Sequence, residues 1–262
     1  MTGQPLAGRR IVVTRPRELA AGLAAAIRAA GGEPLLVPAI EIRDIEDHGP
    51  FQAVVSRLEE FRWAIFVSPM AVRKALALLR AERGAAAWPA RLQVAAIGRG
   101  SQRALQEEGF SAVVASTGTA DSEGLLAMPQ FARFDGERIV IFRGRGGRER
   151  LGDSLTARGA RVEYAECYVR ARPEPGKHDA AIASGAQPID AVTISSAEGL
   201  ANLLDMLDGP GREHLLRAPL LVPHPRVAEQ AAALGAVTVR LAGPSDAEML
   251  AALVAYFGRT QP

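Results

Sequence analysis

Residues 136–151, GERIVIFRGRGGRERL, carry the pattern that decides the fold: a strand, a glycine-rich turn and the start of a helix. After Arg138, residues 139–142 are β-branched or aromatic, so the run 138–142 predicts a short buried strand. The turn at 143–148 holds three arginines in six residues. Leu151 and Leu155 then lie four positions apart, which predicts a helix. This order is typical of an α/β unit whose turn meets a ligand.

The turn has the chemistry of an anion site. Free backbone N–H groups and the positive end of the helix dipole point the same way. Arg143 and Arg148 add donors suited to carboxylate or phosphate. A tight turn with solvated arginines is the alternative. No Gly-Lys-Ser/Thr follows Gly144, and Glu149 stands where a dinucleotide fingerprint has its third glycine. The turn is therefore neither a phosphate loop nor that fingerprint.

A weaker copy of this stretch begins the chain. Gly8–Pro16, GRRIVVTRP, overlays Gly136–Gly144, GERIVIFRG, so that Arg15 falls on Arg143. Further segments recur in the same order, each pair leading into a helical pattern: 63–68 with 190–195, 94–98 with 220–223, and 122–126 with 246–250. This recurrence predicts an internal duplication.

Composition is that of a globular protein, with 48% hydrophobic and 23% charged residues. A length of 262 residues allows one or two domains. The net charge of +2 and the 5% aromatic content argue against a nucleic-acid partner. The single cysteine, Cys167, excludes an intramolecular disulfide and fits a reducing compartment. No run reaches transmembrane length and no signal-peptide core is present, so we expect a cytoplasmic protein without a membrane partner.

Strand and helix patterns alternate throughout, which favours an α/β fold with parallel sheets. In such sheets ligands bind beyond the carboxyl ends of the strands. The candidate binding residues at these ends, or in the helix starts that follow, are Thr14, Arg15, Ser68, Gly98, Ser101, Ser122, Arg143, Gly144, Ser195, Ser196 and His224. A structural alternative exists for Ser68, which stands before Pro69 and is a good helix N-cap with or without a ligand.

The chain resembles a known family. The segments that resemble the uroporphyrinogen-III synthases are TRP at 14–16, FVSPMAV at 66–72, AIG at 96–98, SEGLL at 122–126 and the run from Arg138 to Arg170. The likeness covers nearly the whole chain and is most specific between Arg143 and Tyr168.

The resemblance implies two similar Rossmann/flavodoxin-like parallel-sheet domains joined by a two-stranded β linker. Their expected bounds are 1–38 plus 172–262 for the first, discontinuous domain and 39–171 for the second, with linker crossings near 38–42 and 168–172. The repeat alone would divide the chain near Asp135 instead.

It also implies a lyase that cyclises 1-hydroxymethylbilane to uroporphyrinogen III, with inversion of ring D and loss of water. This linear tetrapyrrole bears an acetate and a propionate on each ring. Its own pyrroles stabilise the cation that the departing hydroxyl leaves, and no metal-ligand spacing is present, so we expect no metal or cofactor. Hydroxymethylbilane synthase would be a transient partner.

By the same resemblance, Tyr168 is the candidate proton donor, with a linker tyrosine packed on the sheet as the alternative. The binding residues named above, together with Arg148, would hold the substrate. At His224 the family's hydroxyl is replaced by a histidine, which leaves the role of that turn open.

Two other classes stay open on the residues alone. A nucleotide-dependent enzyme on a doubled Rossmann-like fold is disfavoured by the missing fingerprint. A non-catalytic, two-domain sensor of small anions remains possible, because no residue is an unmistakable nucleophile.

Overall fold

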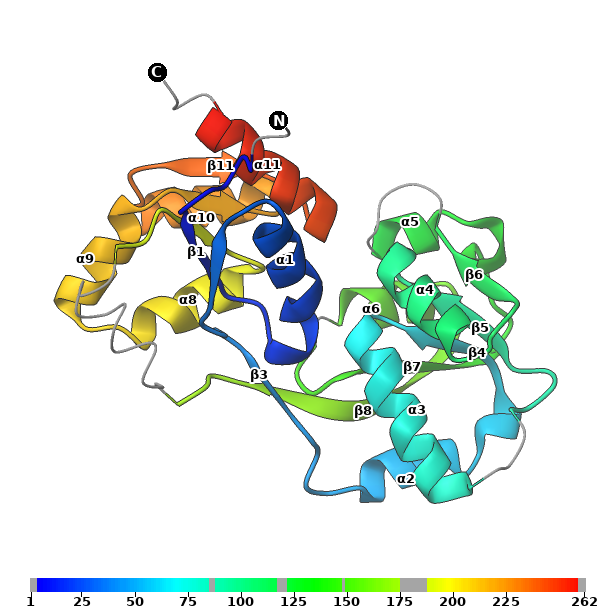
Figure 1. The fold of residues 1–262 in the computed structure, drawn as a ribbon. Helices are drawn as coiled ribbons and strands as arrows, with labels where there is room; N and C mark the ends of the chain where they lie inside the picture. Colours follow the sequence, from blue (N-terminus) through cyan, green and yellow to red (C-terminus); the bar gives the residue numbers. More distant parts are fainter. Residues whose placement is uncertain (1–3, 85–87, 117–121, 148, 175–187, 259–262) are drawn as a thin grey trace. The chain divides into compact units, whose positions relative to one another are not determined.

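The computed structural model describes residues 4–84, 88–116, 122–147, 149–174 and 188–258. The chain forms two compact units (Figure 1). Unit 1 comprises residues 1–42 and 171–262, and unit 2 comprises residues 43–170.

Unit 1 is built on a five-stranded sheet in the order β2-β1-β9-β10-β11, in which all pairs are parallel. The strands are β1 (Arg10–Val13), β2 (Glu33–Leu36), β9 (Ala191–Thr193), β10 (Leu220–Val222) and β11 (Val239–Leu241). The helices are α1 (Arg17–Ala29), α8 (Ala197–Asp205), α9 (Gly209–Arg217), α10 (Pro225–Ala233) and α11 (Asp246–Gly258).

Unit 2 is built on a six-stranded sheet in the order β3-β8-β7-β4-β5-β6. The strands are β3 (Glu41–Arg43), β4 (Phe61–Phe66), β5 (Gln93–Ala96), β6 (Val113–Ala115), β7 (Arg138–Gly144) and β8 (Arg161–Ala171). The helices are α2 (Gly49–Val55), α3 (Pro69–Arg83), α4 (Gly98–Glu107), α5 (Ser122–Leu126) and α6 (Arg150–Ala157), with short 3₁₀ turns at Leu58–Glu60 and Pro129–Phe131.

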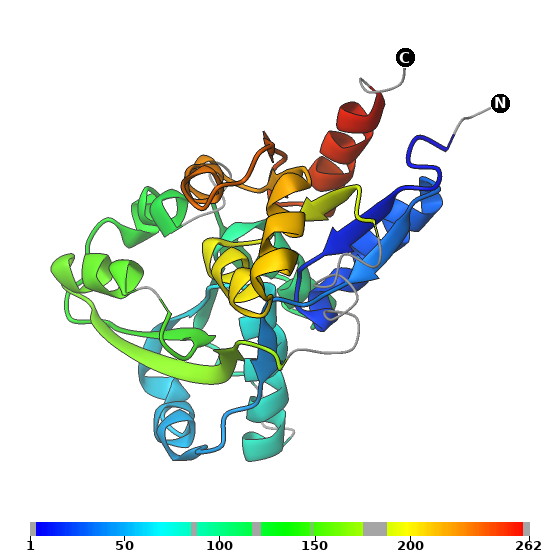
Figure 2. The ribbon, with the colours of Figure 1, turned by 90° about the vertical axis from the view of Figure 1, so that its left-hand side faces the viewer.

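The chain passes between the units along β3 and β8, which are neighbours in the sheet. Figure 2 lets the reader follow the long strand β8, in yellow-green, from a second side. The two parallel-sheet units and their two-stranded linker confirm the predicted fold class.

The two sheets share one strand order. Without β3, the sheet of unit 2 reads β8-β7-β4-β5-β6, which matches β2-β1-β9-β10-β11 strand for strand. This is a doubly wound order. Counted along the chain within each unit, strand 2 lies on one side of strand 1, and strands 3, 4 and 5 follow one another on the other side of strand 1. Three of the repeated pairs of segments lie in equivalent strands, and the fourth pair lies in the helices α5 and α11, so the structure confirms the duplication.

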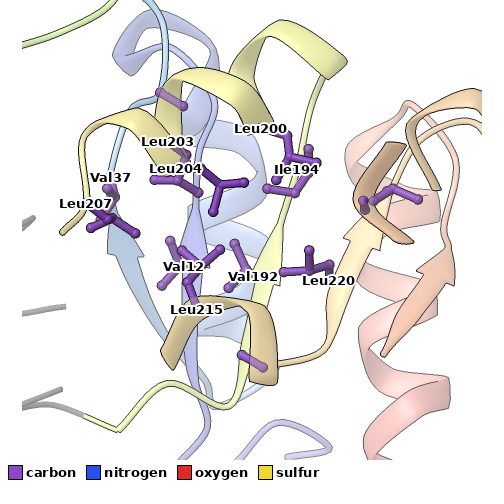
Figure 3. Close-up of a cluster of buried hydrophobic side chains, with 14 of the residues drawn as sticks. Val12, Val37, Val192, Ile194, Leu200, Leu203, Leu204, Leu207, Leu215 and Leu220 are labelled. Carbon is purple, nitrogen blue, oxygen red and sulfur yellow. The ribbon is translucent and has the colours of Figure 1, made fainter. Parts of the chain in front are cut away.

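The core of unit 1 lies on both faces of its sheet. Successive side chains of β1 point to opposite faces, as strand geometry requires. Ile11 and Val13 pack against α1 and α11. Val12 packs with Val192 against leucines of α8 and α9 on the other face, among them Leu203 and Leu215 (Figure 3). Because helices cover both faces of the sheet, a ligand can reach it only at the ends of the strands.

Unit 2 is layered in the same way. Buried residues of β4 and β7 pack against Leu151 and Leu155 of α6 on one face. On the other face Phe66 and Phe142 stack with ring centroids 4.7 Å apart, and Phe51 of α2 lies 6.3 Å from Phe142. Leu151 and Leu155, predicted from their spacing, are therefore core residues.

One local prediction was wrong. The strand predicted for 138–142 continues through Arg143 and Gly144, because these residues pair with β8. The turn that follows lies between Gly144 and Arg150, where helix α6 begins. Pro38, at the predicted linker crossing, lies between β2, which ends at Leu36, and β3, which begins at Glu41.

Candidate active site

Three predicted residues meet in unit 2 where the strand order reverses, between β7 and β4. Crevices at such reversals are the usual ligand sites of doubly wound sheets. The Tyr168 hydroxyl lies 3.3 Å from Ser68 Oγ. Gly144 is the register partner of Tyr168 on the adjacent strand. The tyrosine side chain is buried, so its position is fixed by its neighbours.

Gly144 makes room for the ring of Tyr168. A Cβ atom at position 144 would lie 2.6 Å from Cε2 and 2.7 Å from Cζ of the tyrosine. Carbon atoms in contact stay near 3.5–4.0 Å, so no side chain fits there while the ring keeps its place. The Tyr168 carbonyl also accepts a hydrogen bond of 2.8 Å from the Arg145 N–H.

Two helices of unit 2 begin at the same edge of the sheet. Ser68 is the N-cap of α3, and its Oγ accepts the Ala71 N–H at 3.0 Å, as the sequence predicts. Helix α4 begins at Gly98, whose φ of 76° lies in the left-handed region that favours glycine. Ser101, in the first turn of α4, is 1% exposed, and its Oγ has no hydrogen-bond partner among the described residues.

The glycine-rich turn binds an anion, and that anion belongs to the chain itself. Arg143 Nη2 lies 3.2 Å from Oε1 of Glu166, and the Gly146 N–H donates to the same oxygen at 3.3 Å. Arg145 Nε lies 3.7 Å from Oε2 of Glu166. The predicted anion chemistry is present, but a carboxylate of β8 occupies it.

Arg143 is buried rather than solvated. Its Nη1 donates to the Gly147 carbonyl at 3.1 Å, and its guanidinium carbon lies 3.8 Å above the centre of the Tyr164 ring. Burial raises the pKa of the Tyr164 phenol above its ordinary value, and the charge of Arg143 opposes that shift. The arginine thereby ties the turn to β8.

The equivalent reversal in unit 1 lies between β1 and β9. Thr14 is buried and its hydroxyl donates to the Thr193 carbonyl at 2.8 Å, across the reversal. Arg15 is paired with Asp246, and its Nη2 donates to the Pro244 carbonyl at 2.9 Å. Arg15 and Arg143, equivalent in the repeat, are thus each held by a carboxylate of their own unit.

Helices α8 and α10 begin at the same edge of unit 1. Ser196 is the N-cap of α8 and accepts the Gly199 N–H at 3.0 Å, while Ser195 before it is half-buried. His224 is exposed at the N-cap of α10, where Nδ1 accepts the Arg226 N–H at 3.5 Å. These starts supply backbone N–H groups at the strand ends.

Other predicted residues lie apart from these groups or outside the described residues. Ser122 begins α5, whose next residue Glu123 pairs with Arg150. Arg148 lies outside the described residues. Cys167 is a free, buried cysteine, and desolvation raises the pKa of its thiol to about 12.

Sequence reasoning missed Glu166 and Asp246, the two carboxylates that hold the paired arginines. Alternation along β8 was a usable signal for the first, because it places Tyr164 and Glu166 on one side of the strand, where both contact Arg143. No comparable local signal marks Asp246, which lies 231 positions from Arg15.

Within the described ranges, no three His, Cys, Asp or Glu side chains gather as a metal site would require. In the same ranges, every helix is too short or too polar to cross a membrane.

Comparison with known proteins gives a consistent result. The family model described as uroporphyrinogen-III synthase HemD matches residues 21–251. The uroporphyrinogen-III synthase of Salmonella typhimurium is 32% identical over 241 residues, which cover 92% of this chain and 97% of the relative. The enzyme of Escherichia coli shows the same identity and coverage.

Solved structures agree in fold. A mutant uroporphyrinogen III synthase from Thermus thermophilus superposes with a TM-score of 0.63 at 21% identity, covering 97% of this chain and 100% of that one. The Helicobacter pylori protein gives 0.59 at 14% identity, with 95% and 99% coverage. The family match over most of the sequence and the shared two-unit fold lead to one conclusion: the chain belongs to the uroporphyrinogen-III synthase family.

Proposed function

We propose that this protein converts 1-hydroxymethylbilane to uroporphyrinogen III, and that Tyr168 assists the departure of the hydroxyl group. The proposed reaction is the one that gives this family its name. The observation that supports the role of Tyr168 is its fixed hydroxyl beside Ser68, at the strand reversal of unit 2. The family offers no support for a nucleotide-dependent enzyme or for a non-catalytic sensor.

Substrate binding would rest mainly on backbone donors. Each pyrrole ring carries two carboxylates, and helix N-termini attract such groups through their N–H donors and dipole. The starts of α3 and α4 supply them in unit 2, with Ser68, Gly98 and Ser101. Ser122 at the start of α5 and Gly144 at the end of β7 lie in the same unit.

In unit 1 the corresponding groups are Thr14, Ser195, Ser196 and His224. Arg15 and Arg143 would act at the two reversals by exchanging their own carboxylate partners for those of the substrate. Arg148 is the remaining residue of the proposed substrate-binding set.

In this reaction the protein has to position the substrate and supply one proton. The C–O bond of the hydroxymethyl group breaks with its electron pair going to oxygen, and the Tyr168 proton converts the departing hydroxyl to water. The pyrroles hold the resulting cation until it is attacked by the α-carbon of ring D that already carries a methylene bridge. The bond between that carbon and its bridge then breaks, with the electron pair staying on ring D, and the bridge cation so formed is attacked by the other α-carbon of ring D, which inverts the ring. The closing macrocycle then releases one proton, which returns to the tyrosine. Because the substrate stabilises its own cation, the proposal requires no metal or cofactor.

We further propose that the reaction takes place in the cytoplasm, where a reducing environment keeps the free thiol of Cys167. Hydroxymethylbilane synthase would meet this protein transiently there, because its unstable product closes spontaneously to isomer I.

The deciding experiment is incubation with freshly generated hydroxymethylbilane, followed by separation of the product isomers. We expect isomer III from the native chain and isomer I alone from the heat-denatured chain. In Tyr168→Phe, kcat should fall by about 100-fold with little change in KM, the low end for a lost proton donor. Isomer I alone from the native chain refutes the function, whereas an unchanged kcat in Tyr168→Phe refutes only the tyrosine's role.

A further inference from the structure

Ser68 contacts two groups at once in unit 2. Its Oγ accepts the Ala71 N–H at 3.0 Å in the first turn of α3, and it lies 3.3 Å from the Tyr168 hydroxyl. Helix α3 has 15 residues, so its N-terminus carries a full helix dipole. The serine therefore stands between a helix start and the proposed proton donor.

Either hydroxyl could donate in the contact between Ser68 and Tyr168, and the start of α3 favours the serine as the donor. An N–H group already directs its hydrogen at Ser68 Oγ, and the positive end of the dipole repels a second proton there. The Ser68 O–H is accordingly directed away from α3, toward the Tyr168 oxygen. A tyrosine that accepts from Ser68 keeps its own proton for another acceptor, and the same hydrogen bond stabilises the phenolate once that proton has left.

Gly144 fixes the position of the Tyr168 ring, whose hydroxyl contacts Ser68. The Tyr168 ring lies so close to the β7 backbone that any Cβ at position 144 would overlap it. The ring is thus held on one side by the glycine, while its hydroxyl is held by the serine.

We propose that Ser68 is a positioning residue which directs Tyr168 to donate its proton, with Gly144 as the slot that holds the tyrosine ring. This inference rests on the proposed function and adds residues that act through Tyr168. The dipole of α3 orients the Ser68 hydroxyl, and this hydroxyl in turn donates a hydrogen bond to the tyrosine oxygen.

A double-mutant cycle between Ser68 and Tyr168 tests the proposal. Ser68→Ala should lower kcat for isomer III by about tenfold, the lower range for one hydrogen bond to a charged group, and this loss should exceed any rise in KM from the proposed substrate contact of Ser68. Ser68→Thr, which keeps the hydroxyl and the cap, should restore kcat to within about threefold of the native value. In a Tyr168→Phe background, Ser68→Ala should cause no further loss, because its effect passes through the tyrosine.

Loss of the helix cap is separated from loss of the tyrosine contact by two controls. Asp208 caps α9 through the Gly211 N–H at 2.8 Å and has no part in the site, so Asp208→Ala removes a cap alone and should leave kcat unchanged. Ser68→Asp keeps the cap acceptor but has no proton to donate at neutral pH, so kcat should fall as in Ser68→Ala while thermal stability is retained.

Equal losses from Ser68→Ala with and without the tyrosine would overturn the proposal, as would full activity in Ser68→Asp. A native chain that makes no isomer III would instead overturn the proposed function. The two failures are therefore distinguishable.

Discussion

Replacing Arg143 with lysine tests whether the guanidinium holds the glycine-rich turn in place. The native side chain is 8% exposed, donates to Gly147 and Glu166, and stacks on Tyr164. Lysine keeps the charge but has no planar fork to satisfy both acceptors while stacking. Loss of the stacking costs about 1 kcal/mol. Loss of one charged hydrogen bond costs about 1–2 kcal/mol. We therefore expect unit 2 to lose about 2–3 kcal/mol of unfolding free energy.

Tryptophan fluorescence reads this change in unit 2 alone, because both tryptophans of the chain, Trp63 and Trp88, lie there. Urea unfolding followed by fluorescence should show a lower midpoint in Arg143→Lys with an unchanged slope. Arg15→Lys is the matched control, since it breaks the equivalent pair in unit 1 and should leave the fluorescence transition where it was. A shift below about 0.5 kcal/mol in Arg143→Lys would refute the structural role of the guanidinium, whereas a raised KM reports only its proposed contact with substrate carboxylates.

Four further outcomes are expected. Cys167 should react with a thiol reagent at pH 8 only after unfolding, because its pKa of about 12 leaves almost no thiolate; rapid labelling of the folded chain would contradict its burial. Glu163→Gln should destabilise unit 2 by about 1–2 kcal/mol at pH 7. Burial acts to raise the pKa of Glu163, but the hydrogen bond and charge of Arg138 outweigh it and lower the pKa, so this stability is present above the unfolded pKa and is lost as pH falls through the folded one. Urea midpoints that differ equally at pH 7 and pH 3 would argue against that pair. Ser101→Ala should leave the stability of unit 2 unchanged or higher, because its buried hydroxyl has no partner among the described residues, yet it should raise KM; a lower midpoint would reveal a bond to the hydroxyl. Isomer III formation should survive dialysis against EDTA, and activity that returns only with added metal would contradict the mechanism.

Local sequence patterns predicted what depends on neighbours along the chain. Ser68 before Pro69 is the N-cap of α3, and Leu151 and Leu155 are buried on one face of α6. These features follow from capping and periodicity, which act over three or four residues. Tyr168 was different: its residue pattern indicated only a β run, and the family resemblance alone suggested a role for it.

The partners of the arginines could not be predicted, because they depend on strand register and helix packing. Arg143 meets Glu166 only because β7 and β8 pair in the observed register, which turns the expected solvated or substrate-bound arginine into a buried one. Arg15 meets Asp246 only because α1 and α11 cover the same face of one sheet. Arg15 thus follows the end of β1, whereas Arg143 lies inside β7, and local sequence patterns reveal the partner of neither.

The shared strand order has a consequence for the chain's ancestry and for any attempt to divide it. The first copy of the repeat supplies β1 and β2 to one sheet and β4, β5 and β6 to the other. The second copy supplies β7 and β8, then β9, β10 and β11, in the opposite assignment. One copy alone completes neither sheet, whereas two copies that exchange their strands complete both. The strand arrangement is that of a strand-exchanged dimer whose two copies are joined in one chain. A cut near Asp135 therefore yields two fragments, each of which lacks strands of both sheets.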